Sequence, residues 1–243
     1  MMSFNNCPGP GTFIAITDVS ELADPGLLRM ARNAVDAARL QKTDRYRMEN
    51  DRYRSLAAGI LFRHALRQCG FNPDEILIKE GQKGKPEIVN IPGLYFNLSH
   101  SGDRAMCILS AAEVGCDVEK IDTDRKVMDI ASHFFSQSEK ELLNSVPETE
   151  RCELFFRLWT LKESFLKYTG EGLSLTLDSF SVVIGQGKIC AERQNVPECV
   201  SFFEPELHDG YRYACCCAAA GKPEVHFVKL SEILNEENKE NME

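Results

Sequence analysis

Strand-like apolar runs alternate with amphipathic helical segments along this chain, and the same order of elements occurs twice. In the first half, a strand at residues 12–19 precedes helical spacing at 24–48 and 51–69, and strand-like sequence follows. In the second half, an apolar strand around residue 115 leads into helices, predicted over residues 124–133, 136–145 and 150–173. Strands follow, predicted over residues 178–184, 199–204 and 211–219. This order predicts an α/β protein of the α+β type with two similar lobes, residues 1–113 and 114–233.

The length and composition exclude several classes of protein. The 243 residues are enough for one large domain or two small ones with a shared core, and no run approaches the roughly 18–20 apolar residues of a transmembrane helix. A secretory signal is not predicted, because the first residues lack a basic segment and an apolar segment. The net charge of −9 argues against nonspecific binding to nucleic acid. We expect a cytoplasmic protein that binds neither membranes nor nucleic acid.

Ten cysteines are present, but they form no C-x-x-C motif and no paired framework. Three of them, Cys215–Cys217, are consecutive in the apolar run YACCCAAAG. Adjacent residues of a strand point to opposite faces, which disfavours a joint metal or redox role for the three. They are predicted to be buried thiols of a strand in a reducing compartment.

Charge is distributed unevenly along the chain. Between Arg29 and Arg67 there are ten Arg or Lys and four Asp or Glu, whereas the segment from Ser231 to Glu243 carries five Glu and one Lys. The basic segment indicates an anionic ligand or partner, although a solvated helix face would have the same composition. The acidic end is predicted to be a disordered tail over residues 234–243.

The segment GCDVEKID ends an apolar run with two acids. A strand places side chains i and i+2 on one face, so Asp117 and Glu119 point together. Close carboxylates repel each other unless a cation or a shared proton separates them, and Mg²⁺ is bound by one or two carboxylates with positions left for phosphates. The alternative is a pair of exposed acids at a strand end, with Lys120 as a weak partner. Gly115 is expected to let the strand bend at the boundary between the lobes.

A second segment, LWTLKESFLKYTGEGL, is predicted to be the end of a long helix that Gly170 terminates. Glu163 and Lys167 are four residues apart and share one helical face. A surface salt bridge would explain this spacing. The flanking apolar residues predict a mostly buried helix, however, where a charged pair is costly without a metal ion or a phosphate as partner. We expect Glu163 to complete a three-carboxylate site and Lys167 to face phosphate oxygens.

A third segment, FNLSHSG, is predicted to form a turn after a strand, made of Ser99, His100, Ser101 and Gly102. Hydroxyl groups, a histidine and backbone N–H groups at a turn are able to hold a phosphate. A structural histidine in a turn is the alternative.

Together these segments resemble the 4′-phosphopantetheinyl transferase superfamily, in its large surfactin-synthetase-activating (Sfp-type) branch. The family signature is a G-x-D-x-E strand followed some forty residues later by W-x-x-K-E-(A/S)-x-x-K on a helix, and both parts are complete here. Weaker similarity extends from about residue 39 to residue 219. The resemblance implies two lobes related by pseudo-twofold symmetry, each a small antiparallel sheet packed with helices, with coenzyme A in the cleft between them.

The resemblance also implies roles for individual residues. The carboxylates that match the family's Mg²⁺ ligands, with Mn²⁺ as an alternative ion, are Asp117, Glu119 and Glu163. The residues that match its coenzyme A site are Arg39, Lys42, Arg54, Ser55, Lys85, Ser99, His100 and Lys167. The match at the first four of these is looser, and Ser55 replaces a threonine while keeping the hydroxyl.

The implied reaction transfers the 4′-phosphopantetheine arm of coenzyme A to a serine of an apo acyl or peptidyl carrier protein and releases 3′,5′-ADP, the activity of a holo-(acyl-carrier-protein) synthase. Lys167 and Mg²⁺ are expected to neutralise the pyrophosphate. Glu163 is the expected base, and a water on the metal ion, assisted by Asp117, is the alternative. We expect a monomer, because the two lobes form a pseudo-dimer. The sequence does not indicate whether the carrier serves fatty acid, polyketide or nonribosomal peptide synthesis.

Two other functions fit parts of the pattern. A Mg²⁺-dependent nuclease or phosphohydrolase also clusters acids on strands, but such nucleases commonly have a lysine two residues after the second acid, where this chain has Ile121. A non-catalytic module that binds carrier proteins is the second alternative. The complete set of signature acids and lysine argues against it.

Overall fold

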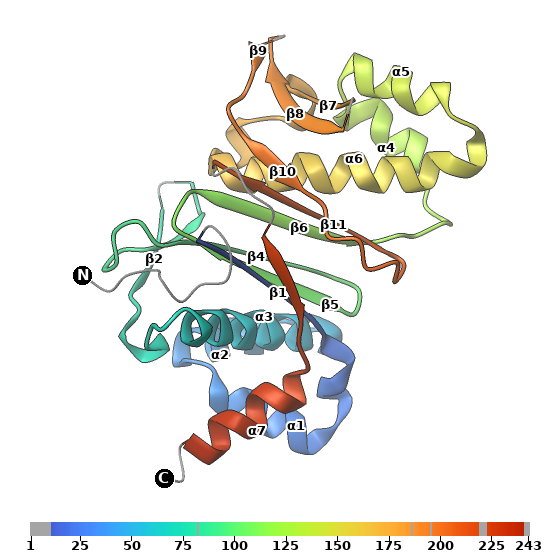
Figure 1. Cartoon of the computed structure of the whole chain (residues 1–243). Coiled ribbons are helices and arrows are strands. Elements are labelled where there is room, and N and C mark those ends of the chain that lie inside the picture. Colours follow the sequence, from blue (N-terminus) through green and yellow to red (C-terminus); the bar gives the residue numbers. More distant parts are fainter. Residues whose placement is uncertain (1–10, 82, 186, 195, 219–222, 241–243) are drawn as a thin grey trace.

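The computed structural model describes residues 11–81, 83–185, 187–194, 196–218 and 223–240. It is layered, with helices of the first lobe, a four-stranded sheet, a three-stranded sheet and helices of the second lobe in succession (Figure 1). The helices are α1 (Pro25–Ala34), α2 (Ala37–Asp44), α3 (Glu49–Gln68), α4 (Val127–Phe134), α5 (Gln137–Ser145), α6 (Glu148–Thr169) and α7 (Leu230–Glu240). The strands are β1 (Thr12–Asp18), β2 (Ile78–Glu80), β3 (Pro86–Ile88), β4 (Tyr95–Ser101), β5 (Arg104–Ser110), β6 (Val114–Lys120), β7 (Ser181–Gly185), β8 (Lys188–Arg193), β9 (Val196–Pro197), β10 (Ser201–Phe203), β11 (Tyr211–Cys217) and β12 (Glu224–Phe227). Within these described residues, no helix is both long and apolar enough to cross a membrane.

The first lobe is built on a sheet with the strand order β12-β1-β5-β4. β1 is antiparallel to β5 and parallel to β12, and β5 is antiparallel to β4. Both faces of β1 are buried, since Phe13 and Ala15 pack with the residues of α3, whereas Ile14 and Ile16 pack with the sheet of the second lobe. A strand buried on both faces is a continuous apolar run in the sequence, as this one is.

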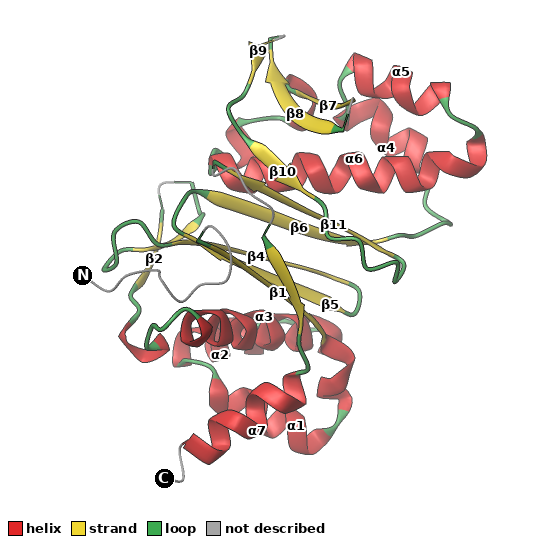
Figure 2. Cartoon of the chain, viewed as in Figure 1, coloured by secondary structure: helices red, strands yellow, loops and turns green. Residues whose placement is uncertain are grey.

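The second lobe has the strand order β10-β11-β6, and α6 lies across the outer face of this sheet (Figure 2). Ala214 and Cys216 of β11 pack with α6, whereas Cys215 packs between the two sheets. Cys215 and Cys216 are buried in a strand, as predicted, whereas Cys217 at the end of β11 is half-buried. The smaller strands β7, β8 and β9 form a separate sheet.

The two lobes share one topology. In the first lobe β1 pairs with β5 and β5 with β4, as in the second lobe β6 pairs with β11 and β11 with β10. One long helix, α3 or α6, covers each sheet (Figure 2). The fold class predicted from the repeated order of elements is confirmed, and the predicted boundary at residues 113 and 114 falls between β5 and β6.

The single helix predicted over residues 24–48 is two helices. α1 ends before Val35, whose backbone is extended, and Asp36 accepts a hydrogen bond of 2.8 Å from the N–H group of Arg39 to begin α2. A side-chain cap of this kind stabilises a new helix start. The helical spacing on both sides of the break hides it in the sequence.

The prediction of a disordered acidic tail over residues 234–243 is wrong for the part that the structure describes, because α7 continues to Glu240. The helix buries three apolar residues in the core of the first lobe, Leu230, Ile233 and Leu234. Glu237 forms an ion pair with Arg67 of α3. Since β12 also joins the first lobe's sheet beside β1, the segment 224–240 belongs to the sheet and core of the first lobe, whereas residues up to 233 were assigned to the second.

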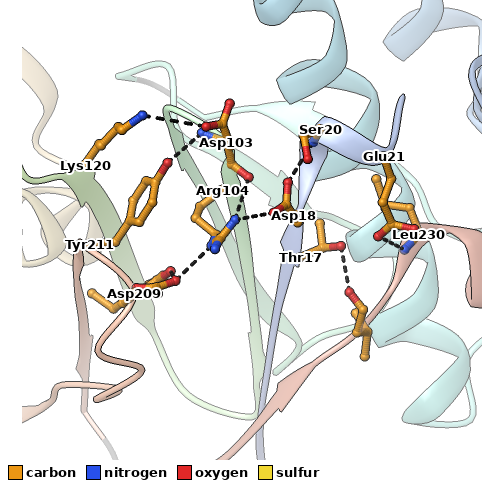
Figure 3. Close-up of polar contacts among 12 residues, drawn as sticks. Thr17, Asp18, Ser20, Glu21, Asp103, Arg104, Lys120, Asp209, Tyr211 and Leu230 are labelled. Atoms are coloured by element: carbon orange, nitrogen blue, oxygen red, sulfur yellow. Dashed lines mark hydrogen bonds and ion pairs between the residues drawn. The ribbon is translucent and has the colours of Figure 1, made fainter. Parts of the chain in front are cut away.

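Arg104, at the start of β5, joins the two lobes (Figure 3). Its guanidinium group pairs with Asp18 of β1 at 2.7 Å and with Asp209 of the second lobe at 2.9 Å. It also lies 5.0 Å from the centre of the Tyr211 ring. The Tyr211 hydroxyl accepts a hydrogen bond of 2.8 Å from the N–H group of Asp103. The turn between β4 and β5 is therefore held from both lobes.

Candidate active site between the lobes

The two acids of β6 point to one side of the strand. Cys116 and Val118 are buried between the sheets, while Asp117 and Glu119 line a cavity with α6, so the predicted alternation is confirmed. β6 lies close against α6 at Gly115, where a Cβ atom would lie 2.1 Å from a backbone oxygen of the helix. The pairing of β6 with β11 continues through this glycine without a break. Close approach of strand to helix, and not the expected bend, explains the glycine.

α6 contributes Trp159, Glu163 and Lys167, one turn apart on one face, to the same cavity. The Lys167 ammonium group donates to Asp117 Oδ1 at 2.7 Å and to Ser99 Oγ at 2.9 Å. Burial lowers the pKa of Lys167, but the charge of Asp117, the hydrogen bond to Asp117 and the charge of Glu163 are among the contributions that together outweigh burial and raise this pKa above its usual value. Lys167 is therefore a charged group that joins the helix to the strand.

β4 continues through Ser101, so Ser99, His100 and Ser101, which were predicted to be in a turn, are still part of the strand. Ser99 is buried, and its hydroxyl donates to Asp117 Oδ1 at 2.8 Å. Ser101 makes the matching hydrogen bond to Glu119 Oε2 at 2.7 Å. The structure thus brings Ser99 to the acids, and it adds Ser101, which was predicted to be in the turn but was not among the residues matched to the coenzyme A site.

Four of the basic residues that match the family's coenzyme A site, namely Arg39, Lys42, Arg54 and His100, lie close enough for their charges to affect one another's pKa values. The pKa of His100 is lowered by loss of solvent around it and by the positive charges of Arg54, Lys167 and Lys42. The pKa of Lys42 is lowered by loss of solvent and by the charge of Arg39, while burial lowers the pKa of Arg39 itself. An anion bound among these cations would relieve their repulsion.

Two other predicted residues make contacts within the protein. The Ser55 hydroxyl is buried and shares a hydrogen bond of 2.8 Å with Thr43, which joins α3 to α2. The Lys85 ammonium group donates to the carbonyl oxygens of Val114 and Tyr168, each at 3.1 Å. Lys85 thereby connects the segment after β2 to the start of β6 and the end of α6. A role for either residue in binding phosphate stays a prediction.

Two cavities meet at Glu163 and Lys167. The smaller has a volume of about 330 Å³ and a polar lining, which includes Ser99, His100, Asp117 and Glu119. The larger has a volume of about 910 Å³ and a mostly apolar lining, which includes Pro86, Phe134, Leu166, Leu175 and Leu177 beside Lys83 and Lys85. Trp159 and Leu98 line both. The arrangement suits an elongated ligand with a charged part and an uncharged part.

The three acids have the chemistry of a site for a hard cation. Burial and the charge of Asp117 raise the pKa of Glu119, and burial and the charges of Asp117 and Glu119 raise the pKa of Glu163. Asp117 is 4% exposed, and its Oδ2 atom has no hydrogen-bond partner among the described residues. Within that part of the chain, however, no three acid, histidine or cysteine side chains stand close enough to form a ready metal cluster. The donors therefore fit Mg²⁺, and a shift of side chains would be needed to surround it.

Lys162, which directly precedes Glu163, is a buried residue whose contacts the sequence analysis missed. It is fully buried and donates to both carboxylate oxygens of Glu139, at 2.7 and 2.8 Å, and to the carbonyl oxygen of Phe180 at 2.7 Å. Glu139 also forms a capping box with Ser136 at the start of α5. The sequence signal for this pair is a lysine within an apolar stretch of helix. The pair fixes α6 against α5 one residue from the candidate base.

Two family models match the chain. The model of the 4′-phosphopantetheinyl transferase superfamily matches residues 113–216, and that of the N-terminal region of 4′-phosphopantetheinyl transferase matches residues 25–113. The two matches together run from α1 into β11, and β1, β12 and α7 lie outside them.

Two relatives match the chain over most of their length. The chain is 34% identical to 4′-phosphopantetheinyl transferase Sfp of Bacillus subtilis (strain 168) over 197 residues, which are 80% of this chain and 87% of the relative. It is 36% identical to 4′-phosphopantetheinyl transferase gsp of Aneurinibacillus migulanus over 188 residues, 76% of this chain and 77% of the relative. Among solved structures, the holo-[acyl-carrier-protein] synthase of Thermotoga maritima has a TM-score of 0.36 and 20% identity, covering 46% of this chain and 64% of that chain.

Proposed function

The chain belongs to the 4′-phosphopantetheinyl transferase superfamily, and we propose that it transfers the 4′-phosphopantetheine arm of coenzyme A to a serine of an apo carrier protein. The observation that carries this proposal is the meeting of Asp117, Glu119, Glu163 and Lys167 at one cavity. These four come from a strand and a helix that are far apart in the sequence. Such a convergence of acids and a lysine suits phosphoryl-group chemistry.

Coenzyme A has a pyrophosphate, a 3′-phosphate and an uncharged pantetheine arm. We assign the pyrophosphate to the polar cavity beside Lys167, and the 3′-phosphate to the cluster of Arg39, Lys42, Arg54 and His100. The apolar cavity that adjoins Lys167 is the proposed place of the arm. This assignment matches each part of the substrate to a lining of its own polarity.

Asp117, Glu119 and Glu163 are the proposed ligands of a Mg²⁺ ion. Such an ion would neutralise the negative charge that develops on the pyrophosphate as the bond to the leaving group breaks. Two observations support the assignment: the Oδ2 atom of Asp117 has no hydrogen-bond partner within the described part of the chain, and the pKa values of the two glutamates are raised.

Glu163 is the proposed general base. A raised pKa makes its carboxylate a stronger proton acceptor than an ordinary glutamate. As the carrier serine passes its proton to Glu163, the serine oxygen bonds to the phosphorus of the arm. The bond from that phosphorus to the adenosine side of the pyrophosphate breaks, and its electron pair leaves with 3′,5′-ADP. Lys167 holds a positive charge beside these phosphates throughout.

We further propose a cytoplasmic monomer with holo-(acyl-carrier-protein) synthase activity. The cysteines of the described residues form no disulfide bond with one another, which suits a reducing compartment. Ser99 of the first lobe and Lys167 of the second already meet within one chain, so the site needs no second copy.

The proposal is tested by incubating the protein with coenzyme A, Mg²⁺ and a panel of apo acyl and peptidyl carriers, followed by intact mass spectrometry. We expect at least one carrier to gain the mass of one phosphopantetheine arm, and the gain to stop when the metal is chelated. Asp117→Ala should abolish transfer, whereas Asp124→Ala, an exposed acid beyond β6, should not change it. No mass gain on any carrier contradicts the proposed function.

A further inference from the structure

β4 and β6 lie side by side at the boundary between the lobes. They are joined there by hydrogen bonds from backbone N–H groups to side chains, and not by a backbone–backbone ladder. Each strand is an edge of its own sheet. The outward N–H groups of β6 donate to side-chain oxygens of β4, in the pairs Cys116 to Asn97 at 3.0 Å, Val118 to Ser99 at 3.3 Å and Lys120 to Ser101 at 3.2 Å. The separation is 19 residues in each pair, so the strands are parallel and in register. We call this set the side-chain ladder.

The two serines of the side-chain ladder have a second bond. Each donates its only hydroxyl hydrogen to the carboxylate one residue before its N–H partner, Ser99 to Asp117 and Ser101 to Glu119. A hydroxyl has only one hydrogen. While the serine oxygen accepts a hydrogen bond from the N–H group of β6, that hydrogen points to the neighbouring carboxylate. At the remaining position the preceding residue is Gly115, which has no carboxylate, and the partner there is Asn97.

The end of the side-chain ladder is held from both lobes. Arg54 of α3 donates to the carbonyl oxygen of Gly102 at 2.9 Å. Asp103 contacts Tyr211 and Lys120 of the second lobe (Figure 3). Ser101 therefore stands beside a turn that cannot shift without breaking contacts on either side.

We propose that Ser101 is a positioning residue that orients the Glu119 carboxylate for the cation, and that the side-chain ladder sets the register of one lobe against the other. The role of Ser101 rests on the proposed function, whereas the role of the ladder does not. A backbone ladder would satisfy the edge of β6 equally well, but it would supply no hydrogen bond to the acids. The serines accept hydrogen bonds from the N–H groups of β6 and donate to its carboxylates. The contact that joins the lobes therefore also orients the carboxylates.

The side-chain ladder is tested without metal or substrate by amide hydrogen exchange of individual residues. Ser101→Ala should speed exchange of the Lys120 amide by about tenfold, the effect of losing one hydrogen bond, and Ser101→Thr should restore protection. Ser110→Ala is the matched control, because Ser110 shares a 2.9 Å hydrogen bond with Thr12 at the far end of β5. Unchanged exchange at Lys120 in Ser101→Ala overturns the ladder.

The positioning role is tested by titrating Mg²⁺ in the presence of coenzyme A while following the fluorescence of Trp159, the single tryptophan of the chain, which lines the site. Ser101→Ala should raise the half-saturating Mg²⁺ concentration by about tenfold, as loss of a ligand's hydrogen-bond partner does. Ser101→Thr should return it toward the wild-type value, and Ser110→Ala should leave it unchanged. Equal titration curves for Ser101→Ala and wild type overturn the positioning role alone. A wild-type protein that modifies no carrier overturns the proposed function instead, and amide exchange still decides the ladder.

Discussion

The Lys167 ammonium nitrogen lies 2.7 Å from Asp117 Oδ1, so an ion pair joins α6 to β6 at the centre of the candidate site. Asp117 is nearly inaccessible, whereas Lys167 is about 30% exposed and reaches the cavity. Asp117 thus accepts a hydrogen bond from Lys167 at Oδ1, whereas its Oδ2 atom has no partner among the described residues. One lysine holds the acid in place and faces the proposed pyrophosphate position.

Replacement of this lysine should therefore affect both activity and stability. Lys167→Met removes a positive charge from the leaving group, and we expect kcat to fall about 100-fold or more. It also leaves Asp117 buried without its ion-pair partner, which costs about 3 kcal/mol of unfolding free energy. Steady-state kinetics and urea unfolding measure the two effects. Lys120→Met, a half-exposed lysine of β6, serves as control, and a kcat for Lys167→Met equal to that of this control would contradict the assignment.

The close approach of β6 to α6 predicts a large effect for a small change. A Cβ atom at Gly115 would lie 2.1 Å from the carbonyl oxygen of Ser164 and 2.3 Å from the backbone nitrogen of Tyr168. Gly115→Ala must push strand and helix apart, so we expect a loss of about 1–3 kcal/mol in unfolding free energy together with a lower kcat. Gly185→Ala, a glycine with open space around it, should have neither effect. Wild-type stability and kcat in Gly115→Ala would show that the backbones need not approach so closely.

Local pattern was sufficient for the parts of the site that depend on one element. Alternation along β6 places Asp117 beside Glu119, and four-residue spacing on α6 does the same for Glu163 and Lys167. The contact between Ser101 and Glu119 depends instead on which strand edges meet, and no local periodicity carries that information. Ser55 is a similar case, because only the packing of α2 on α3 provides its partner.

The C-terminal helix shows a different kind of error. Leu230, Ile233 and Leu234 follow the i, i+3, i+4 spacing of a buried helix face. The acidic residues around them favoured a disordered tail when composition was considered alone. Apolar spacing was the better guide here, because the charged residues need only occupy the exposed face of the helix.

The buried pair of Lys162 and Glu139 should be important for stability. Lys162→Met leaves the Glu139 carboxylate without its ammonium partner in an environment that is about 1% exposed, and we expect a loss of about 3–5 kcal/mol. The N–H group of Val182 donates a hydrogen bond to Glu139 at 2.7 Å. In the double variant with Glu139→Gln, the amide oxygen of the glutamine can still accept this hydrogen bond. The double variant should therefore lose less than the sum of the single losses. Urea unfolding of the two single variants and the double variant checks this. Lys140→Met, on α5 beside Glu139, is the control. Additive losses would mean that the two charges do not stabilise each other.

His64 predicts how stability depends on pH. It lies on α3 beside Phe13, which stacks on His226 with ring centroids 4.8 Å apart. Burial, together with the charges of Arg67 and His226, lowers the pKa of His64 from 6.5 to about 4. Below its ordinary pKa the unfolded chain binds a proton at this residue that the folded chain does not bind, so stability is full above pH 6.5 and falls as the pH drops toward 4.

Between about pH 7 and about pH 5 this single group should lower the unfolding free energy by about 2 kcal/mol. His64→Gln cannot take up the proton, so its unfolding free energy, measured in urea at several pH values, should change by that much less over the same range. His133→Gln, which replaces an exposed histidine of α4, should keep the wild-type slope. If His64→Gln and wild type lose stability equally on acidification, His64 is protonated as readily in the folded protein as in the unfolded chain. That result would contradict the prediction that His64 stays neutral between α3 and β12.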